Sequence, residues 1–165
     1  MKVLSHRKIG QKITRMAIEI IENNYDEKEI ILAGINNNGS AFAQLLLKEL
    51  SKIDEKKIFT LAQIRLDPAN PIHQKISISL SDEEMNGKTI IIVDDVANSG
   101  RTIFYACKPI FNIVPKKIEA AVLVDRTHKS YPIKVDYIGL ALATTLKENI
   151  RVNLSEPNNF AVFLE

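Results

Sequence analysis

The chain has 165 residues, of which 45% are hydrophobic and 25% charged, and its formal net charge is +2. These values are typical of a soluble globular protein, and the length suits one domain spanning residues 1–165. The single cysteine, Cys107, excludes an internal disulfide. No apolar run approaches membrane-spanning length and no secretory signal is visible, so we expect a cytoplasmic protein without membrane contact.

The first predicted element is an amphipathic helix over about Ser5 to Asn24. Apolar residues recur at gaps of three and four from Ile9 to Ile21, and Ser5 is a suitable N-cap. Its polar face carries several Lys and Arg side chains. We interpret this face as solvated rather than as a nucleic-acid patch.

A strand–loop–helix unit follows, with a strand over Glu29–Ala33, a loop over Gly34–Ser40 and a helix over Ala41–Leu50. Asparagine and glycine tolerate left-handed backbone angles, so Asn36 to Gly39 predict a tight turn. An ordinary turn would use the same residues. Two β-stretches are then expected over Lys57–Leu66 and Gln74–Leu80, joined by a proline-bounded loop.

The central stretch begins with the unbroken apolar run Thr89–Val93, which predicts a strand buried on both faces of a parallel sheet. Two carboxylates, Asp94 and Asp95, follow at its carboxyl end, where open α/β sheets bind their ligands. The small and hydroxylated residues Ala97–Thr102 then lead into a helix predicted over Ile103–Ile113.

This central stretch predicts a sugar-phosphate site. A glycine-containing turn at a helix start offers free N–H groups to a phosphate, and paired carboxylates suit ribose hydroxyls or a hydrated Mg²⁺. The alternative is an acidic strand end followed by an ordinary turn. Further strands are expected over Ile118–Val124, Val135–Leu142, Ile150–Leu154 and Phe160–Leu164. The fold class is therefore α/β, with a mostly parallel sheet flanked by helices and a small β-rich tail.

Residues Val93–Thr102 resemble the phosphoribosyl-pyrophosphate (PRPP) signature of the type I phosphoribosyltransferases. The resemblance implies the fold of that family, PRPP as substrate and Mg²⁺ as cofactor. Asp94 and Asp95 would hold the ribose and the metal, and Asn36, Asn37, Asn38 and Gly39 would form the pyrophosphate loop. The 5′-phosphate would be wrapped by Ala97, Asn98, Ser99, Gly100, Arg101 and Thr102.

The segments 121–129 and 136–139 are similar to one branch, the pyrimidine-operon attenuators with uracil phosphoribosyltransferase activity. This resemblance implies that Arg65 reaches pyrophosphate and acts with the two aspartates. It also implies a base pocket formed by Asp125, Arg126, Tyr137 and Ile138. For Tyr137, a half-buried strand aromatic is an equally open interpretation. The implied function is transfer of ribose 5-phosphate from PRPP to uracil or a related base, by a homodimer or higher oligomer. The alternative is a nucleotide-sensing, RNA-binding regulator with weak or no transferase activity.

The sequence departs from the family at several positions. Asn36–Asn38 replace the Lys- and Arg-containing pyrophosphate loop of the attenuators. Asn98 stands where purine-salvage relatives have a carboxylate, and an amide cannot usefully accept a proton near neutral pH. The expected hood loop is short and carries Pro68 and Pro71. Leu140–Ala143 replace a polar loop, so the choice of base rests on little in the sequence.

Overall fold

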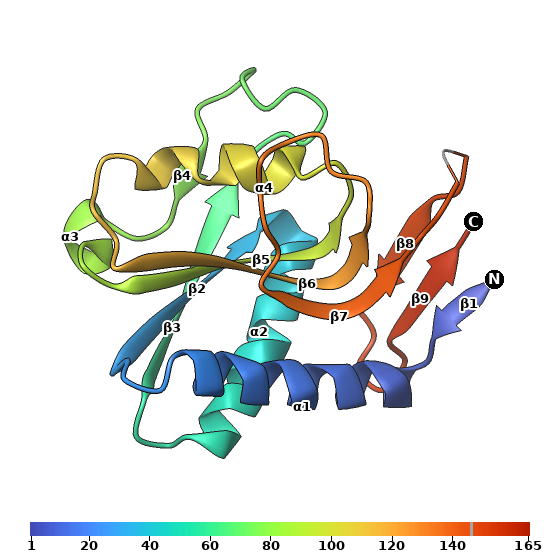
Figure 1. Ribbon diagram of the computed structural model, residues 1–165, viewed down its shortest axis with the longest axis horizontal. Helices are drawn as coiled ribbons and strands as arrows, with labels where there is room; N and C mark the ends of the chain where they lie inside the picture. Colours follow the sequence, from blue (N-terminus) through green and yellow to red (C-terminus); the bar gives the residue numbers. More distant parts are fainter. Residues whose placement is uncertain (146) are drawn as a thin grey trace.

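The computed structural model describes residues 1–145 and 147–165, and its centre is a six-stranded sheet (Figure 1). The strand order is β4-β3-β2-β5-β6-β7, and all neighbours are parallel except β4, which is antiparallel to β3. The predicted mostly parallel sheet is therefore confirmed. Its strands are β2 (Glu29–Ile35), β3 (Ile58–Arg65), β4 (Ser77–Ile78), β5 (Thr89–Ala97), β6 (Lys117–Arg126) and β7 (Tyr137–Leu142).

Helices cover both faces of this sheet because its inner strands are apolar on both faces. Along β2, Ile30 and Leu32 face one hydrophobic cluster while Ile31 and Ala33 face another, as the two-residue period of a strand requires. The first cluster lies under α1 (His6–Asn23) and α2 (Asn36–Ile53). The second lies under α3 (Asp82–Met85), α4 (Arg101–Ala106) and the 3₁₀ helix η1 (Lys108–Ile110). Figure 1 shows α1 and α2 on the side opposite α4.

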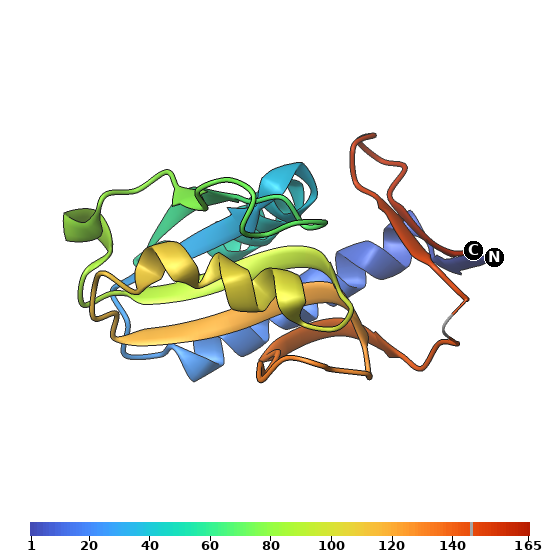
Figure 2. The same cartoon turned by 90° about the horizontal axis from the view of Figure 1, so that it is seen from above.

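A second, three-stranded antiparallel sheet joins the two ends of the chain, in the order β1-β9-β8. It contains β1 (Lys2–Leu4), β8 (Ile150–Asn153) and β9 (Ala161–Leu164). Figure 2 shows this small sheet at one end of the molecule, beside the start of α1. The predicted β-rich tail is confirmed as a hairpin, whereas β1 was not predicted. A run of three residues is too short to show a period.

The boundaries of four predicted elements differ most from the structure. Helix α2 begins at Asn36 instead of Ala41, and β5 continues through the aspartate pair to Ala97. The helix predicted over Ile103–Ile113 stops at Ala106 and resumes as η1, because Pro109 has no N–H to continue an α-helix. Of the stretch Gln74–Leu80, only Ser77 and Ile78 pair as a strand. The first helix is confirmed, with Ser5 as its N-cap.

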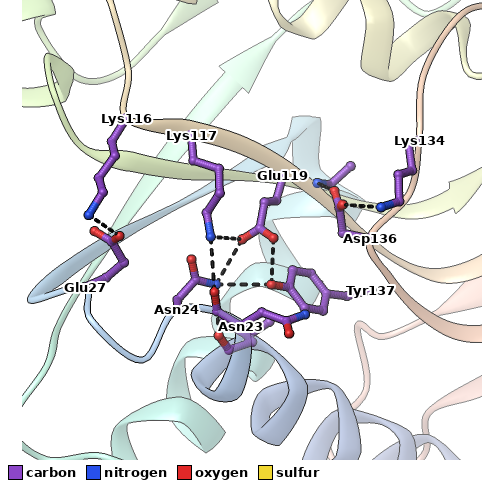
Figure 3. A network of polar contacts seen from close by, with 11 residues as sticks. Asn23, Asn24, Glu27, Lys116, Lys117, Glu119, Lys134, Asp136 and Tyr137 are labelled. Carbon is purple, nitrogen blue, oxygen red and sulfur yellow. Dashed lines mark hydrogen bonds and ion pairs between the residues drawn. The ribbon is translucent and has the colours of Figure 1, made fainter.

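The amino ends of the strands are closed by a buried polar network between α1, β6 and β7 (Figure 3). The Tyr137 hydroxyl donates to Glu119 Oε2 at 2.8 Å, and Asn24 Nδ2 donates to Glu119 Oε1 at 2.9 Å. Burial, and then the hydrogen bond to Glu119, raise the pKa of Tyr137 far above its usual range, so it stays a donor. This network fixes the end of α1 on the sheet and leaves the carboxyl ends of the strands open.

None of the helices in residues 1–145 and 147–165 combines the length and hydrophobicity of a bilayer-spanning segment.

Candidate active site

Two adjoining hollows lie at the carboxyl ends of the parallel strands. The larger, of about 430 Å³, is lined by Ile35, Asn36, Asn37, Asn38, Pro68, Asp94, Asp95, Val96, Asn98, Thr102 and Ile150. The smaller, of about 280 Å³, is lined by Pro68 and residues 96–103. Both include Asn98 and Thr102, so the structure brings the predicted acid pair and the predicted phosphate loop together in one continuous site.

The two aspartates sit in different environments at the end of β5. Asp94 is only 7% exposed, whereas Asp95 is half-buried. Burial, followed by the neighbouring charge of Asp95, raises the pKa of Asp94 well above its ordinary value. Asn38 Nδ2 donates to Asp95 Oδ2 at 3.1 Å. Two neighbouring carboxylates, one of them buried, favour a ligand that supplies a cation or hydroxyl donors, because an apolar ligand would leave their charge unpaired.

The phosphate loop, residues 97–102, is held from behind by the segment between β6 and β7. Ser99 O accepts hydrogen bonds from the N–H groups of Ser130, at 2.9 Å, and Tyr131, at 3.2 Å. Gly100 has a φ of +86°, and a Cβ atom built there would lie 2.6 Å from Cγ1 of Ile133. The first turn of α4 leaves N–H groups without intrahelical acceptors, which is suited to a phosphate. Arg101 Nη2 donates to Pro68 O at 2.6 Å and so joins this loop to the segment after β3.

The predicted pyrophosphate loop is instead the first turn of α2. Asn36 has a φ of +51°. Its side chain makes two hydrogen bonds to the backbone of Leu66: Oδ1 accepts from the Leu66 N–H at 3.1 Å, and Nδ2 donates to the Leu66 carbonyl at 2.9 Å. Arg65 Nη1 donates to Asn37 Oδ1 at 3.0 Å. Gly39 permits close packing, since a Cβ atom there would lie 2.6 Å from Val93 O. The structure therefore places Arg65 beside this turn, and the hydrogen bonds of Asn36 to Leu66 hold the turn against the segment after β3.

The residues predicted for the base pocket line neither of the two hollows. Tyr137 is fully buried in the polar network at the amino end of the strands, so no base can stack on it. The Ile138 carbonyl accepts a hydrogen bond from Arg15 at 2.9 Å, and Ile138 lines neither hollow. The sequence did not reveal either position, for one reason. Alternation along β7 does not reveal which face meets α1, nor at which end the ligand lies.

Asp125 and Arg126 lie beside the hollows instead of lining them. The Asp125 carboxylate pairs with the ammonium group of Lys129. Arg126 Nη1 donates to Asn98 Oδ1 at 3.3 Å, and Nη2 donates to Thr145 O at 2.9 Å. Arg126 therefore contacts the lining of the site only through its hydrogen bond to Asn98, among the contacts of the described residues.

Four residues that line the larger hollow were not predicted: Ile35, Pro68, Val96 and Ile150. Val96 follows the acid pair directly, and its place could have been anticipated from the continuation of β5. Ile150 arrives from β8, which contacts β5 only through tertiary packing. No local pattern in the sequence places β8 there.

The residues present fit a magnesium ion that also binds substrate. Among the described residues, no group of three or more His, Cys, Asp or Glu side chains could enclose a metal ion by itself. Mg²⁺ commonly keeps several waters and takes one or two carboxylates together with substrate phosphates. Asp94 and Asp95 provide such carboxylates beside the phosphate loop.

A model of the phosphoribosyl transferase domain matches residues 2–155. The chain therefore belongs to the phosphoribosyltransferase family, and the predicted family, enzyme class and PRPP-dependent function are confirmed. The chain is also similar to proteins named Bifunctional protein PyrR. It is 36% identical to that of Macrococcus caseolyticus, covering 93% of this chain and 91% of the relative. It is 37% identical to that of Alkaliphilus metalliredigens, covering 93% and 88%. The predicted resemblance to this branch is confirmed.

Solved structures confirm the predicted fold. A hypoxanthine-guanine phosphoribosyltransferase from Bacillus anthracis, with HEPES in its active site, superposes with a TM-score of 0.78. The match has 20% identity and covers 99% of this chain and 96% of that one. The hypoxanthine phosphoribosyl transferase of Trypanosoma cruzi gives a TM-score of 0.76 at 15% identity, covering 98% and 90%. At these identities the likeness shows the fold alone.

Proposed function

We propose that this protein transfers the phosphoribosyl group of Mg²⁺-bound PRPP to uracil or a closely related pyrimidine, with release of pyrophosphate. The observation that carries the proposal is the continuous site in which the Asp94–Asp95 pair adjoins the phosphate loop 97–102. One hollow suits a 5′-phosphate and the other a ribose with its leaving group, a combination that PRPP provides.

The reaction needs positioning and charge stabilisation more than a nucleophile of the protein. The bond from the anomeric carbon to pyrophosphate breaks, and its electron pair leaves with pyrophosphate. A ring nitrogen of the base forms the new bond to carbon and gives up its proton to solvent. The phosphate loop would anchor the 5′ end, Asp94 and Asp95 would orient the ribose, and Arg65 would face the leaving group. Bound Mg²⁺, held by the two aspartates and by substrate oxygens, would neutralise part of the pyrophosphate charge.

A pyrimidine is favoured over a purine by two observations. The relatives at 36% and 37% identity carry the name PyrR, in the branch whose resemblance implied uracil. In addition, Asn98 offers no carboxylate to accept a proton from a 6-oxopurine. The base would lie between the aliphatic side chains of Val96 and Ile150, which line the larger hollow.

A second candidate function is a nucleotide-sensing regulator that binds RNA and turns over slowly or not at all. The observation in its favour is the charge of the larger hollow. Its lining includes two aspartates and four asparagines but no lysine or arginine. A pyrophosphate group carries several negative charges, and neutral amides bind anions more weakly than charged donors do.

The deciding experiment supplies Mg²⁺ and PRPP with each common nucleobase in turn, and follows nucleotide formation and pyrophosphate release. The double variant Asp94→Asn, Asp95→Asn serves as the control. Uracil-dependent release that the double variant lacks supports the enzyme. Nucleotide binding by calorimetry, without release from any base, would instead favour the regulator, and gel-shift assays with pyrimidine-operon leader RNA would then test its partner.

We further propose a cytoplasmic homo-oligomer. Supporting an oligomer, Ile58 and Leu61 on β3 are exposed apolar residues, 59% and 38% accessible. A cytoplasmic site would suit PRPP, a highly charged molecule that does not cross bilayers unaided. Light scattering coupled to size-exclusion chromatography would give the number of subunits, and a monomer at micromolar concentration would contradict this proposal.

A further inference from the structure

We propose that the outer face of α1 pairs with the same face of a second copy of this chain, with the two helices antiparallel. Helix α1 packs one side against α2 and β7 (Figure 1). Its other side is a shallow, open surface whose lining comes from α1 alone. This face, called the α1 face below, shares no residue with the two hollows or with the exposed apolar residues of β3, so the proposal does not rest on phosphoribosyl transfer.

The α1 face carries a notch and an uncovered aliphatic side chain. Gly10 lies inside the helix, where glycine is about 1 kcal/mol less favourable than alanine. Packing within the protomer does not require a glycine there, because a Cβ atom at Gly10 would meet no atom within 4 Å. Ile18, about two turns further along the same face, is 42% exposed. The notch and the isoleucine are therefore both left free for a partner.

A two-fold axis at Thr14 places the notch opposite the isoleucine. In two antiparallel helices related by this axis, residues equally far before and after Thr14 lie at the same level. Gly10 is four positions before Thr14 and Ile18 is four positions after it, so each Ile18 faces the partner subunit's Gly10. The Thr14 hydroxyl has acceptors within its own protomer, Gly10 O at 3.2 Å and Glu49 Oε1 at 3.1 Å. It therefore meets the partner without an unpaired donor.

The charges at the two ends of the α1 face are complementary in the same arrangement. Arg7 is seven positions before Thr14 and Glu22 is eight after it, so they lie about 1.5 Å apart along the axis across the pair. Both are exposed, and neither side chain has a hydrogen bond or ion pair within the parts of the chain that the structure describes. Arg15 and Glu19 already pair with each other at 2.6 Å. Arg7 and Glu22 therefore carry the complementarity, once at each end.

A second copy fits the α1 face better than a nucleic acid does. The face holds two arginines and two glutamates, so its net charge is zero, whereas surfaces that bind phosphate backbones carry excess positive charge. One helix covers less than a standard interface of about 1,600 Å², so we expect a weak contact with a Kd on the order of 10 µM. Salt should weaken it further, because the charge pairs lie at the surface.

The test is sedimentation velocity over a range of protein concentrations, with two charge reversals studied apart and mixed. Arg7→Glu and Glu22→Arg should each raise the Kd at least about tenfold, because like charges then face each other at both ends. An equal mixture of the two variants should associate about as tightly as the parent, since each offers the charge that the other lacks. Lys8→Glu makes the same charge change at an exposed position of α1 outside the face, and is the matched control.

The notch is tested separately by Gly10→Leu. Leucine favours a helix more than glycine does, and its Cβ has open space in the protomer, so the melting temperature should not fall. Self-association should nevertheless be lost, because the side chain fills the place of the partner's Ile18. A role in folding alone would not combine an unchanged or higher melting temperature with lost association. Any association through β3 contributes equally to every sample.

Three results would overturn the proposal. The first is a parent whose average mass does not rise with concentration, and the second is a charge-reversal variant that associates like the parent. The third is a mixture that fails to recover what the separate variants lose. If Glu22→Arg instead tightens RNA binding and Arg7→Glu weakens it, with no change in mass, the α1 face belongs to a nucleic acid. Failure to form nucleotide from any base would refute phosphoribosyl transfer and leave these masses unaffected.

Discussion

At the scale of single residues, Asp94 shows how the ligand site opposes the stability of the empty protein. Its carboxylate is buried at the end of an apolar strand and lies next to a second carboxylate. Both the burial and the charge of Asp95 favour the protonated form. A bound cation would favour the deprotonated form of both carboxylates. The free-energy cost of burying them would then be offset when ligand binds.

Asp94→Asn should therefore stabilise the unliganded protein while weakening Mg²⁺-PRPP binding. The pKa of Asp94 is raised on folding, so the native state retains its proton longer than the unfolded chain. The stability penalty is absent below the unfolded pKa of about 4, grows as pH rises toward the folded pKa, and is constant above it. At pH 8 we expect a Tm gain of about 2–4 °C, equivalent to about 1 kcal/mol for this chain length.

Thermal melts of the parent and Asp94→Asn from pH 4 to pH 8 would check this prediction. Asp26→Asn, which changes an exposed carboxylate after α1, is the control and should melt like the parent throughout. A Tm gain that is the same at pH 4 and pH 8 would contradict the proposed cause.

Gly100 can be tested against a second glycine with the same backbone geometry. Gly100 and Gly87 both have positive φ, +86° and +73°, but only Gly100 faces Ile133, whereas a Cβ at Gly87 would meet no atom within 4 Å. Gly87→Ala should cost about 1 kcal/mol of backbone strain and leave binding unchanged. Gly100→Ala should cost more and should also weaken ribose 5-phosphate binding about tenfold, equivalent to about 1.4 kcal/mol.

Calorimetric titration of both variants with ribose 5-phosphate, together with urea denaturation, separates the two effects. If both variants lose stability equally and both keep full affinity, the loop 97–102 does not hold the phosphate.

At the scale of elements, the start of α2 and the end of β3 form one unit. Asn36 bonds both backbone groups of Leu66, and Asn37 accepts from Arg65, so the first turn of α2 fixes where the segment after β3 begins. Asparagine suits the left-handed backbone at Asn36 better than a longer side chain would. A lysine at this position would lose both bonds to Leu66, which makes Asn38 the better place to add charge.

Asn38→Arg should raise turnover with the preferred base. The leaving pyrophosphate gains a cationic donor beside the larger hollow, and an arginine can still donate to Asp95 as Asn38 does. We expect an increase in kcat of about tenfold, equivalent to roughly 1.4 kcal/mol of barrier. Asn38→Gln is the neutral control. Equal kcat for the parent and Asn38→Arg, measured by pyrophosphate release, would mean that this turn does not limit the reaction.

The elements also show what the sequence can and cannot predict. Strands β2, β5 and β6 were predictable because a strand buried on both faces has an uninterrupted apolar run. The gathering of residues 94–102 around one pair of hollows was predictable because these residues lie within one short segment. The start of α2 was not, because Asn36–Gly39 have turn composition and their helical turn depends on Leu66, thirty positions away. The wall of the larger hollow depends on which strands meet in space, so Ile150 was missed, and Tyr137 was expected there although it is buried at the other end of the sheet.

At the scale of the whole molecule, the site is assembled from two sheets. The six-stranded sheet supplies the acid pair and the phosphate loop, while the three-stranded sheet supplies Ile150 from β8. The small sheet depends on both chain ends, because β9 pairs with β1 and Met1 N donates to Leu164 O. In the proposed placement, with the base against Ile150, base binding and PRPP anchoring use different parts of the structure, so a substitution in one part can change one without the other.

Ile150→Ala should raise the KM for the base and leave PRPP binding nearly unchanged. The variant removes three carbon atoms from the aliphatic wall of the larger hollow, where each buried methylene contributes about 0.8 kcal/mol. Because a ligand covers this wall only in part, we expect a KM increase of about tenfold, or about 1.4 kcal/mol. Arg151→Ala is the matched control, since adjacent strand residues point to opposite faces and Arg151 instead contacts Phe163 and Glu165.

Initial rates at varied base and saturating PRPP give the KM, and calorimetry gives the PRPP affinity. If Ile150→Ala weakens PRPP and leaves the KM for the base unchanged, β8 covers the pyrophosphate side and the base must enter elsewhere.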